Sequence, residues 1–268
     1  MFNILKASLF KLFRDRTFQV TAIIGIVLAG FMALVGVLSK TITGEGTFLS
    51  SFSLANGFGL TVPINLIVFT VGEFTYGTVR NKIIAGFSKG KIYAGLFLTG
   101  LVFTFILVTV YVGVSLIIAT SISGFDGSKI GGASFILTYI AFAIVTYAFT
   151  TALSIFVATS IRNIGGSISI VIILLVMISL APLFTFMSDP EKMALVGLDH
   201  WSTWLNPVQM IGFYTNDVIR IIAKFAPPGA NFFALSPNMI IAGLVTPIYW
   251  AVILYVIGYL TFKYSDVK

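Results

Sequence analysis

The chain has 268 residues, of which 58% are hydrophobic and only 9% charged, and its mean hydropathy is +1.05. Soluble domains contain about 25% charged residues, so this composition excludes a water-soluble enzyme, a disordered chain and a fibrous repeat, and predicts a membrane protein. The net charge of +7 does not indicate nucleic-acid binding, because the basic residues are scattered in short clusters between apolar runs. Zero cysteines and one histidine exclude a disulfide framework, a thiolate zinc site, a cysteine nucleophile and a multi-histidine metal centre.

Six apolar segments are long enough to cross the hydrocarbon core of a bilayer, which takes about 20 residues of helix. Their cores contain no Asp, Glu, Lys, Arg or His. The sequence therefore predicts an all-α, multi-pass plasma-membrane protein with a single transmembrane domain over residues 1–268. The predicted spans are Thr17–Leu38, Ser50–Gly72, Ile92–Ile122, Ala133–Ser160, Gly165–Met187 and Asn238–Phe262.

Lys and Arg are distributed unequally between the two sides that six spans would create. Eleven lie on the side that holds both termini, and five lie on the other side. Because cytoplasmic loops carry an excess of Lys and Arg, we expect both termini in the cytoplasm. The eleven are Lys6, Lys11, Arg14, Arg16, Arg80, Lys82, Lys89, Lys91, Arg162, Lys263 and Lys268; the five are Lys40, Lys129, Lys192, Arg220 and Lys224.

The segment ahead of the first span has apolar residues at helical spacing with basic residues between them. This pattern predicts an amphipathic helix on the cytoplasmic leaflet; the alternative is a solvated leader held only by charge. The apolar residues are Phe2, Leu5, Leu9 and Leu12, and the basic ones are Lys6, Lys11 and Arg14.

The first two spans carry small and helix-breaking residues. Gly25, Ala29 and Ala33 form a small-residue face at which another helix can approach, either within the monomer or in a dimer. The second span is interrupted by Asn56-Gly57-Phe58-Gly59 and by a proline, which leaves a backbone carbonyl unpaired one turn earlier. Such backbone is tolerated where it is covered by helices or lines a cavity. The candidate pathway residues in this span are Asn56, Thr61, Pro63 and Asn65.

The loop Glu73–Tyr93 between the second and third spans has the strongest local pattern. Its middle, Thr78 to Ala85, has helical apolar spacing, and Gly86 is a natural C-terminal stop. A basic turn, Ser88-Lys89-Gly90-Lys91, follows. Two interpretations are possible: a short helix that binds a partner, or a plain positive-inside loop. The pattern favours the helix. The run from Gly86 to Lys91 is one residue too short for a phosphate-binding loop and lacks its Ser or Thr.

The segment Ser188–Pro237 is predicted to lie outside the cell. It contains an amphipathic helix starting at Pro207 that either caps a cavity or simply packs on the membrane surface. His200 lies beside Asp199, but neighbouring residues do not face each other, so we interpret it as a surface histidine. We expect no catalytic residue, no metal site and no cofactor in this chain.

Transporters driven by proton or sodium gradients usually hold ionisable groups within their helices. The predicted spans contain none. If the chain performs uphill transport, its energy is therefore expected to come from another polypeptide, and the Glu73–Tyr93 loop is the expected contact.

The layout and this loop resemble a type-2 ABC transporter permease. The resemblance in layout covers nearly the whole chain, whereas the motif covers about twenty residues. Two departures from the family pattern are Lys89, where many members have Arg, and Leu96, where many have Lys. The matching motif residues are Glu73, Gly77-Thr78, Arg80, Ser88-Lys89 and Ile92-Tyr93.

The resemblance implies that the loop is a coupling helix seated on a separate ABC ATPase, and that ATP and Mg²⁺ bind to that partner. It implies two ATPase copies, a second copy of the permease or a related one, and a pathway among spans one, two and five. The expected activity is export of an apolar or amphipathic cargo, either a peptide or a drug-like molecule. The alternatives are a non-transporting scaffold or immunity protein and a lipid or polysaccharide exporter. The expected coupling residues are Glu73, Tyr76, Gly77, Thr78, Arg80, Asn81, Lys82, Ser88, Lys89 and Lys91.

Overall fold

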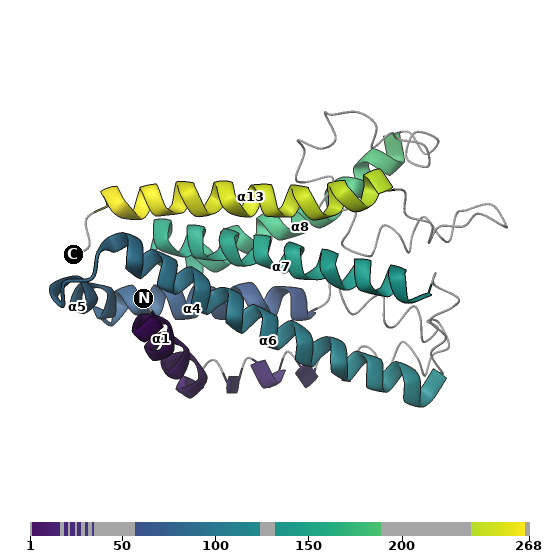
Figure 1. The fold of residues 1–268 in the computed structure, drawn as a ribbon, viewed down its shortest axis with the longest axis horizontal. Helices are drawn as coiled ribbons and strands as arrows, with labels where there is room; N and C mark the ends of the chain where they lie inside the picture. Colours follow the sequence, from purple (N-terminus) through teal and green to yellow (C-terminus); the bar gives the residue numbers. More distant parts are fainter. Residues whose placement is uncertain are drawn as a thin grey trace.

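The computed structural model describes residues 2–16, 57–123, 132–188 and 237–265, together with residues 19–20, 22–24, 26–27, 30–31 and 34. Every regular element in these ranges is an α-helix, which confirms the predicted all-α class for this part of the chain (Figure 1). The helices are α1 (Phe2–Arg14), α4 (Gly57–Thr75), α5 (Thr78–Ile84), α6 (Lys89–Ser123), α7 (Gly132–Ile161), α8 (Ile164–Ser188) and α13 (Pro237–Tyr264).

Three of these helices contain stretches long and apolar enough to cross a membrane: Lys89–Val110, Ile140–Ile161 and Leu244–Tyr264. The bent pair α4 and α5 makes a fourth if it is counted as one span, and α8 contributes a shorter apolar stretch, Ile164–Met177. Within the described residues the structure therefore supports a membrane protein with three or four candidate spans. The predicted first span lies mostly outside these residues.

Helix α7 is at the centre of the bundle, because α4, α6, α8 and α13 all pack against it. Gly100 allows α6 to pack tightly on α7: a Cβ atom there would lie 2.9 Å from Ile155 Cδ1 and 3.0 Å from Thr151 Cγ2 on α7. The third neighbour is Leu66 of α4, at 3.3 Å. A hydroxyl pair, Thr104 and Thr151, joins α6 to α7 one turn further along, with 2.9 Å between the two Oγ1 atoms. These contacts hold α4, α6 and α7 in one core.

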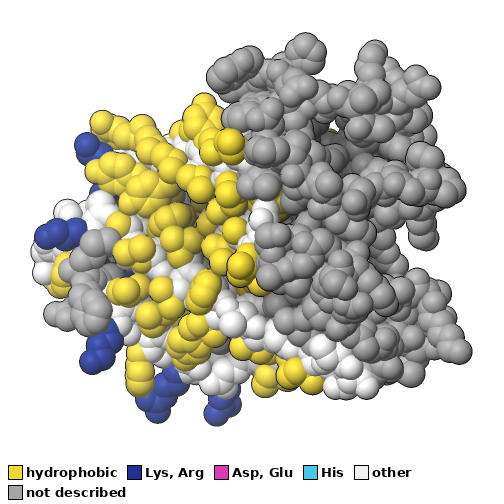
Figure 2. All heavy atoms as spheres, turned by 45° about the vertical axis from the view of Figure 1, so that its right-hand side comes forward, with side chains coloured by type: hydrophobic (Ala, Val, Ile, Leu, Met, Phe, Trp, Pro, Cys, Tyr) yellow, Lys and Arg dark blue, Asp and Glu magenta, His cyan; other side chains and the backbone are white. Residues whose placement is uncertain are grey.

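One end of the bundle collects the basic residues. Helix α5, the first turn of α6, the α7–α8 turn and the last turn of α13 lie together at the left of Figure 1, and α1 lies beside them. Figure 2 shows Lys and Arg side chains along the edge of a broad hydrophobic surface. Of the eleven basic residues expected on one side of the membrane, all but Lys268 are among the described residues, in or next to the elements at this end. We call it the basic end.

Some predicted features lie outside the described residues. They are the small-residue face Gly25, Ala29 and Ala33, the candidate pathway residue Asn56, and nearly all of the outer segment Ser188–Pro237 with its histidine, His200.

Candidate functional site

The chain turns sharply between α4 and α5, where the axes of the two helices differ by 55°. Gly77 makes this turn in the left-handed conformation, with φ +66° and ψ +11°, and its carbonyl accepts the first backbone bond of α5, from Asn81 N at 2.9 Å. A residue with a Cβ atom is strained in this conformation by about 1–2 kcal/mol. The glycine therefore fixes the direction in which α5 leaves the bundle.

Helix α5 ends in a Schellman motif. Gly86 has φ +86°, its N–H donates to Ile83 O at 2.9 Å, and the N–H of Phe87 donates to Lys82 O at 3.1 Å. The prediction of a short helix stopped by Gly86 is confirmed, with α5 ending at Ile84. Ser88 then caps α6 by accepting a bond from Lys91 N at 3.4 Å.

Glu73, one turn before the bend, is fully buried with both carboxylate oxygens paired. Lys11 Nζ of α1 lies 2.6 Å from its Oε1, and Lys82 Nζ of α5 lies 2.6 Å from its Oε2. An unpaired buried carboxylate would carry a large desolvation penalty, so the two ammonium groups make this burial possible. One side chain of α4 thus holds two other helices.

The same lysines form a second set of bonds that crosses between α1 and α5. Lys11 Nζ donates to Thr78 Oγ1 at 3.2 Å, and Lys82 Nζ donates to Ser8 Oγ at 3.4 Å. Each lysine therefore contacts both Glu73 and the opposite short helix. We call these five residues, Ser8, Lys11, Glu73, Thr78 and Lys82, the Glu73 cluster.

The burial pattern of α1 agrees with this attachment. Leu12 is 1% exposed and lies in the core, whereas Phe10 and Phe13 on the other side are 65% and 42% exposed. The predicted amphipathic helix is therefore present, and its inner face packs on the protein. Its outer face leaves two aromatic rings available for a membrane surface.

The outward face of α5 and its flanks is both apolar and basic. Tyr76 and Ile84 are 77% and 75% exposed, and Phe87 is 36% exposed. Arg80 and Asn81 are exposed between them, and Lys91 follows at the start of α6. We define the outward face of α5 as these six residues, Tyr76, Arg80, Asn81, Ile84, Phe87 and Lys91.

A second set of cations fixes the end of α13 next to this site. Lys89 Nζ donates to the carbonyls of Lys263 and Ser265, at 2.9 and 2.8 Å. Arg162 has a left-handed backbone (φ +56°), donates to Ser265 Oγ, and places its guanidinium 5.1 Å from the ring centroid of Phe74. A cation favours the C-terminal end of a helix, so these two residues attach α13 to α4, α6 and the α7–α8 turn.

The ten expected coupling residues thus lie in three environments. Glu73, Thr78 and Lys82 belong to the interior Glu73 cluster; Gly77, Ser88 and Lys89 shape or attach the flanking helices; and Tyr76, Arg80, Asn81 and Lys91 lie on the outward face of α5.

Sequence reasoning missed the roles of Lys11, which it assigned to the polar face of the amphipathic helix and to the orientation count, and of Arg162, which it counted only as a marker of orientation. It also missed Ile84 and Phe87 as parts of an exposed surface. The signal for Lys11 was available, because a carboxylate ending an apolar span requires a nearby cation.

The described pathway candidates lie inside α4. Pro63 is buried, Asn65 is 3% exposed and donates its Nδ2 to Thr61 O at 3.0 Å, and Thr61 is half-buried. The Asn65 amide thus bonds to the backbone of its own helix.

Comparison with known proteins does not assign this chain: no protein-family model matches it, and no curated protein matches it.

Proposed function

We propose that this chain is the permease subunit of an ATP-driven ABC exporter of type 2, and that the outward face of α5 binds the ATPase subunit. The observation that carries the proposal is the combination of a rigidly held short helix with an exposed apolar and basic surface. The Glu73 cluster attaches α5 to α1 and α4. Tyr76 and Ile84 remain more than 70% exposed at the basic end.

Exposed apolar side chains beside charged ones are typical of protein interaction surfaces. In this arrangement Tyr76, Ile84 and Phe87 supply the apolar contact, and Arg80 and Lys91 favour an acidic partner surface. In this proposal the basic end is the cytoplasmic end, because cytoplasmic segments carry an excess of Lys and Arg. A partner bound there has access to ATP. ATP and Mg²⁺ then bind to the ATPase, and this chain supplies the membrane part and no catalytic group.

In this proposal ATP binding draws two ATPase subunits together and displaces α5. Because α5 is joined to α1 through the bond from Lys11 to Thr78 and to α4 through the pair of Lys82 with Glu73, the displacement passes to both helices. The resulting rearrangement moves an apolar or amphipathic cargo outward through a pathway shared with a second permease copy.

The test is co-purification of the membrane-expressed chain with an ABC ATPase and measurement of its ATP hydrolysis. Arg80→Glu and Ile84→Glu alter exposed side chains and leave the Glu73 cluster intact, so we expect at least tenfold lower ATPase recovery with an unchanged melting temperature. Lys263→Glu is the matched control, because Lys263 is an exposed cation at the same end on α13. Equal recovery with all variants contradicts the proposal, and partner binding that needs no ATPase favours the scaffold function instead.

A further inference from the structure

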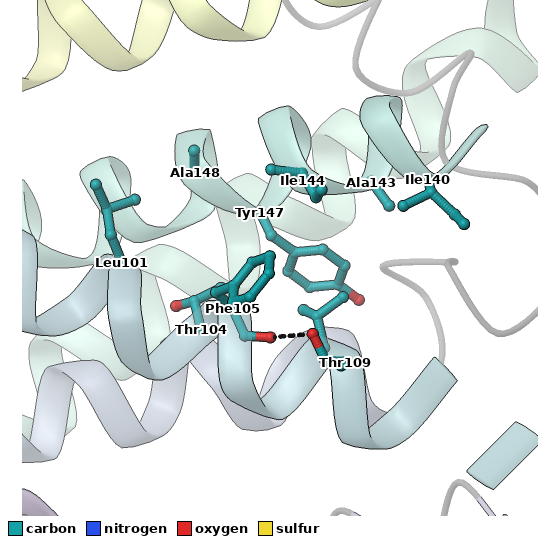
Figure 3. A pocket seen from close by; sticks show the side chains of 10 residues that line it. Leu101, Thr104, Phe105, Thr109, Ile140, Ala143, Ile144, Tyr147 and Ala148 are labelled. Atoms are coloured by element: carbon teal, nitrogen blue, oxygen red, sulfur yellow. Dashed lines mark hydrogen bonds between the residues drawn. The ribbon is translucent and has the colours of Figure 1, made fainter. Parts of the chain in front are cut away.

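A pocket of about 510 Å³ lies between α6 and α7, away from the basic end (Figure 3). Each helix contributes five residues that follow one another at positions i, i+3, i+4, i+7 and i+8, which is one face of an α-helix. Two of the α7 residues are alanines, and their small side chains leave the space open. The lining residues are Leu101, Thr104, Phe105, Val108 and Thr109 of α6, and Ile140, Ala143, Ile144, Tyr147 and Ala148 of α7.

The position of the pocket along α6 places it deep in the membrane. Leu101 follows the last charged residue, Lys91, by ten residues, which is a rise of about 15 Å. The hydrocarbon core is about 30 Å thick, so the pocket begins near the middle of the layer and extends into the half away from the basic end. All ten lining residues belong to the candidate spans Lys89–Val110 and Ile140–Ile161.

The polar atoms of the two lining threonines are already engaged. Thr104 Oγ1 bonds to Thr151 Oγ1 at 2.9 Å, and Thr109 Oγ1 donates to Phe105 O at 2.8 Å, the bond drawn in Figure 3. The ten lining residues include no Asp, Glu, Lys, Arg or His, and the third lining hydroxyl, Tyr147 Oη, is itself buried. The surface offered to a ligand is therefore hydrocarbon and aromatic, and a ligand that needs hydrogen bonds or a counter-ion would lose free energy there.

The pocket is accessible from the outer surface of the helix pair. Phe105 and Ile144, which line it, are 57% and 43% exposed, and Leu137, one turn before Ile140, is 66% exposed. Side chains exposed at this depth face lipid in a membrane. The occupant that this environment supplies is a flexible hydrocarbon chain whose polar head stays at the membrane surface.

We propose that the pocket binds one acyl chain of a membrane phospholipid. The chain inserts between α6 and α7 beyond their tight contact at Gly100 and fills the space that Ala143 and Ala148 leave open. The selectivity is for the chain, since the ten lining residues include no charged group that would pair with a headgroup. This binding does not require an ATPase partner, so it is independent of the proposed function.

The first experiment counts retained lipids by native mass spectrometry after transfer of the protein from dioleoylphosphatidylcholine bilayers into detergent. We expect one retained lipid on the wild type and at least fivefold lower occupancy for Ala148→Phe, whose ring fills the pocket. Ala141→Phe is the matched control, because Ala141 lies on the same helix but does not line the pocket, and we expect wild-type occupancy. Equal occupancy in all three proteins, or no retained lipid on the wild type, overturns the proposal.

The second experiment needs no variant. A phosphatidylcholine with a diazirine in one acyl chain is photolysed in bilayers with the wild-type protein, and the labelled residues are mapped by peptide sequencing. We expect labelling of Phe105, Ile144 and Tyr147 at least fivefold above that of Leu137 and Val110, which are exposed but do not line the pocket. If all five residues are labelled to the same extent, the proposal is overturned. Replacing the phosphatidylcholine by a phosphatidylglycerol with the same chains should leave the labelling pattern unchanged. Loss of the pattern would contradict the proposal that the acyl chain is what the pocket recognises.

Discussion

Lys11 Nζ lies 2.6 Å from Glu73 Oε1, and this ion pair joins the N-terminal helix to the end of α4 across 62 positions of sequence. The carboxylate is fully buried, whereas the lysine side chain is 40% exposed. Lys82 occupies the other oxygen, so Glu73 has a counter-ion from each side of the bend. Five predictions about this end of the molecule follow from its contacts.

Replacing Lys11 by Met should destabilise the protein by about 1–3 kcal/mol. Removing one partner of a buried pair costs about 3–5 kcal/mol, and the exposure of Lys11 together with the remaining Lys82 lowers that figure. The measurement is the free energy of unfolding in detergent, with proteolysis near α1 as a second readout. Lys6→Met, which changes an exposed lysine on the same helix, should stay within about 0.5 kcal/mol of wild type. Equal effects of the two substitutions on the free energy of unfolding would show that the ion pair makes no net contribution to stability.

Gly77→Ala should destabilise the protein by about 1–2 kcal/mol, because alanine is strained at φ +66°. The space around this position is open, so the effect is one of backbone conformation and not of a clash. Gly113→Ala is the control: it also adds a methyl group in open space, within α6, and should be neutral or slightly stabilising. Thermal melting of both variants in the same detergent tests whether the melting temperature falls for Gly77→Ala and stays equal or rises for Gly113→Ala.

Lys89→Met should loosen the last turn of α13, because the carbonyls of Lys263 and Ser265 lose their donor. We expect hydrogen exchange of the backbone amides near the end of α13 to become at least fivefold faster. Lys91→Met removes an exposed lysine two residues away and should leave that exchange unchanged. Unchanged exchange in Lys89→Met would mean that Arg162 alone holds the end of the helix.

Tyr93→Phe should raise the melting temperature. The Tyr93 side chain is fully buried against Tyr255, Tyr259 and Phe262, and its hydroxyl has no hydrogen-bond partner in the described part of the chain. A buried, unsatisfied polar group costs about 1–3 kcal/mol. A melting temperature at or below the wild-type value contradicts this account of the hydroxyl.

Gly258→Ala gives a related test, since a Cβ atom at Gly258 would overlap the Tyr93 hydroxyl and lie 3.3 Å from Phe156 Cδ2. The single variant should be destabilised, and adding Tyr93→Phe should recover most of the loss. A double-mutant cycle on the free energies of unfolding measures the coupling between the two residues. Additive effects would show that the two residues do not interact.

The local structure around α5 could be predicted well from sequence, because its determinants are local. Gly77 and Gly86 adopt the left-handed conformation that glycine favours, and the apolar spacing between them defines one short helix. The long apolar runs likewise predict α6 and α7. These features depend on neighbours within a few positions in the chain.

The contacts between helices could not be predicted in the same way. The positive-inside pattern counts Lys11, Lys89 and Arg162 as equivalent charges, yet each has a specific partner far along the sequence. The pocket between α6 and α7 has no sequence signal either. Ala143 and Ala148 would suit a tight helix contact equally well, and only the packing of the two helices decides that they open a space.

The pairing of residue 11 with residue 73 also sets an order for biogenesis. Lys11 leaves the ribosome before Glu73 and Lys82 exist, because chains are made from the N-terminus. Until then α1 has no carboxylate to bind, and its exposed rings, Phe10 and Phe13, are its available attachment to the bilayer. The N-terminal helix can therefore gain its ion pair with the bundle only after the end of α4 has been made.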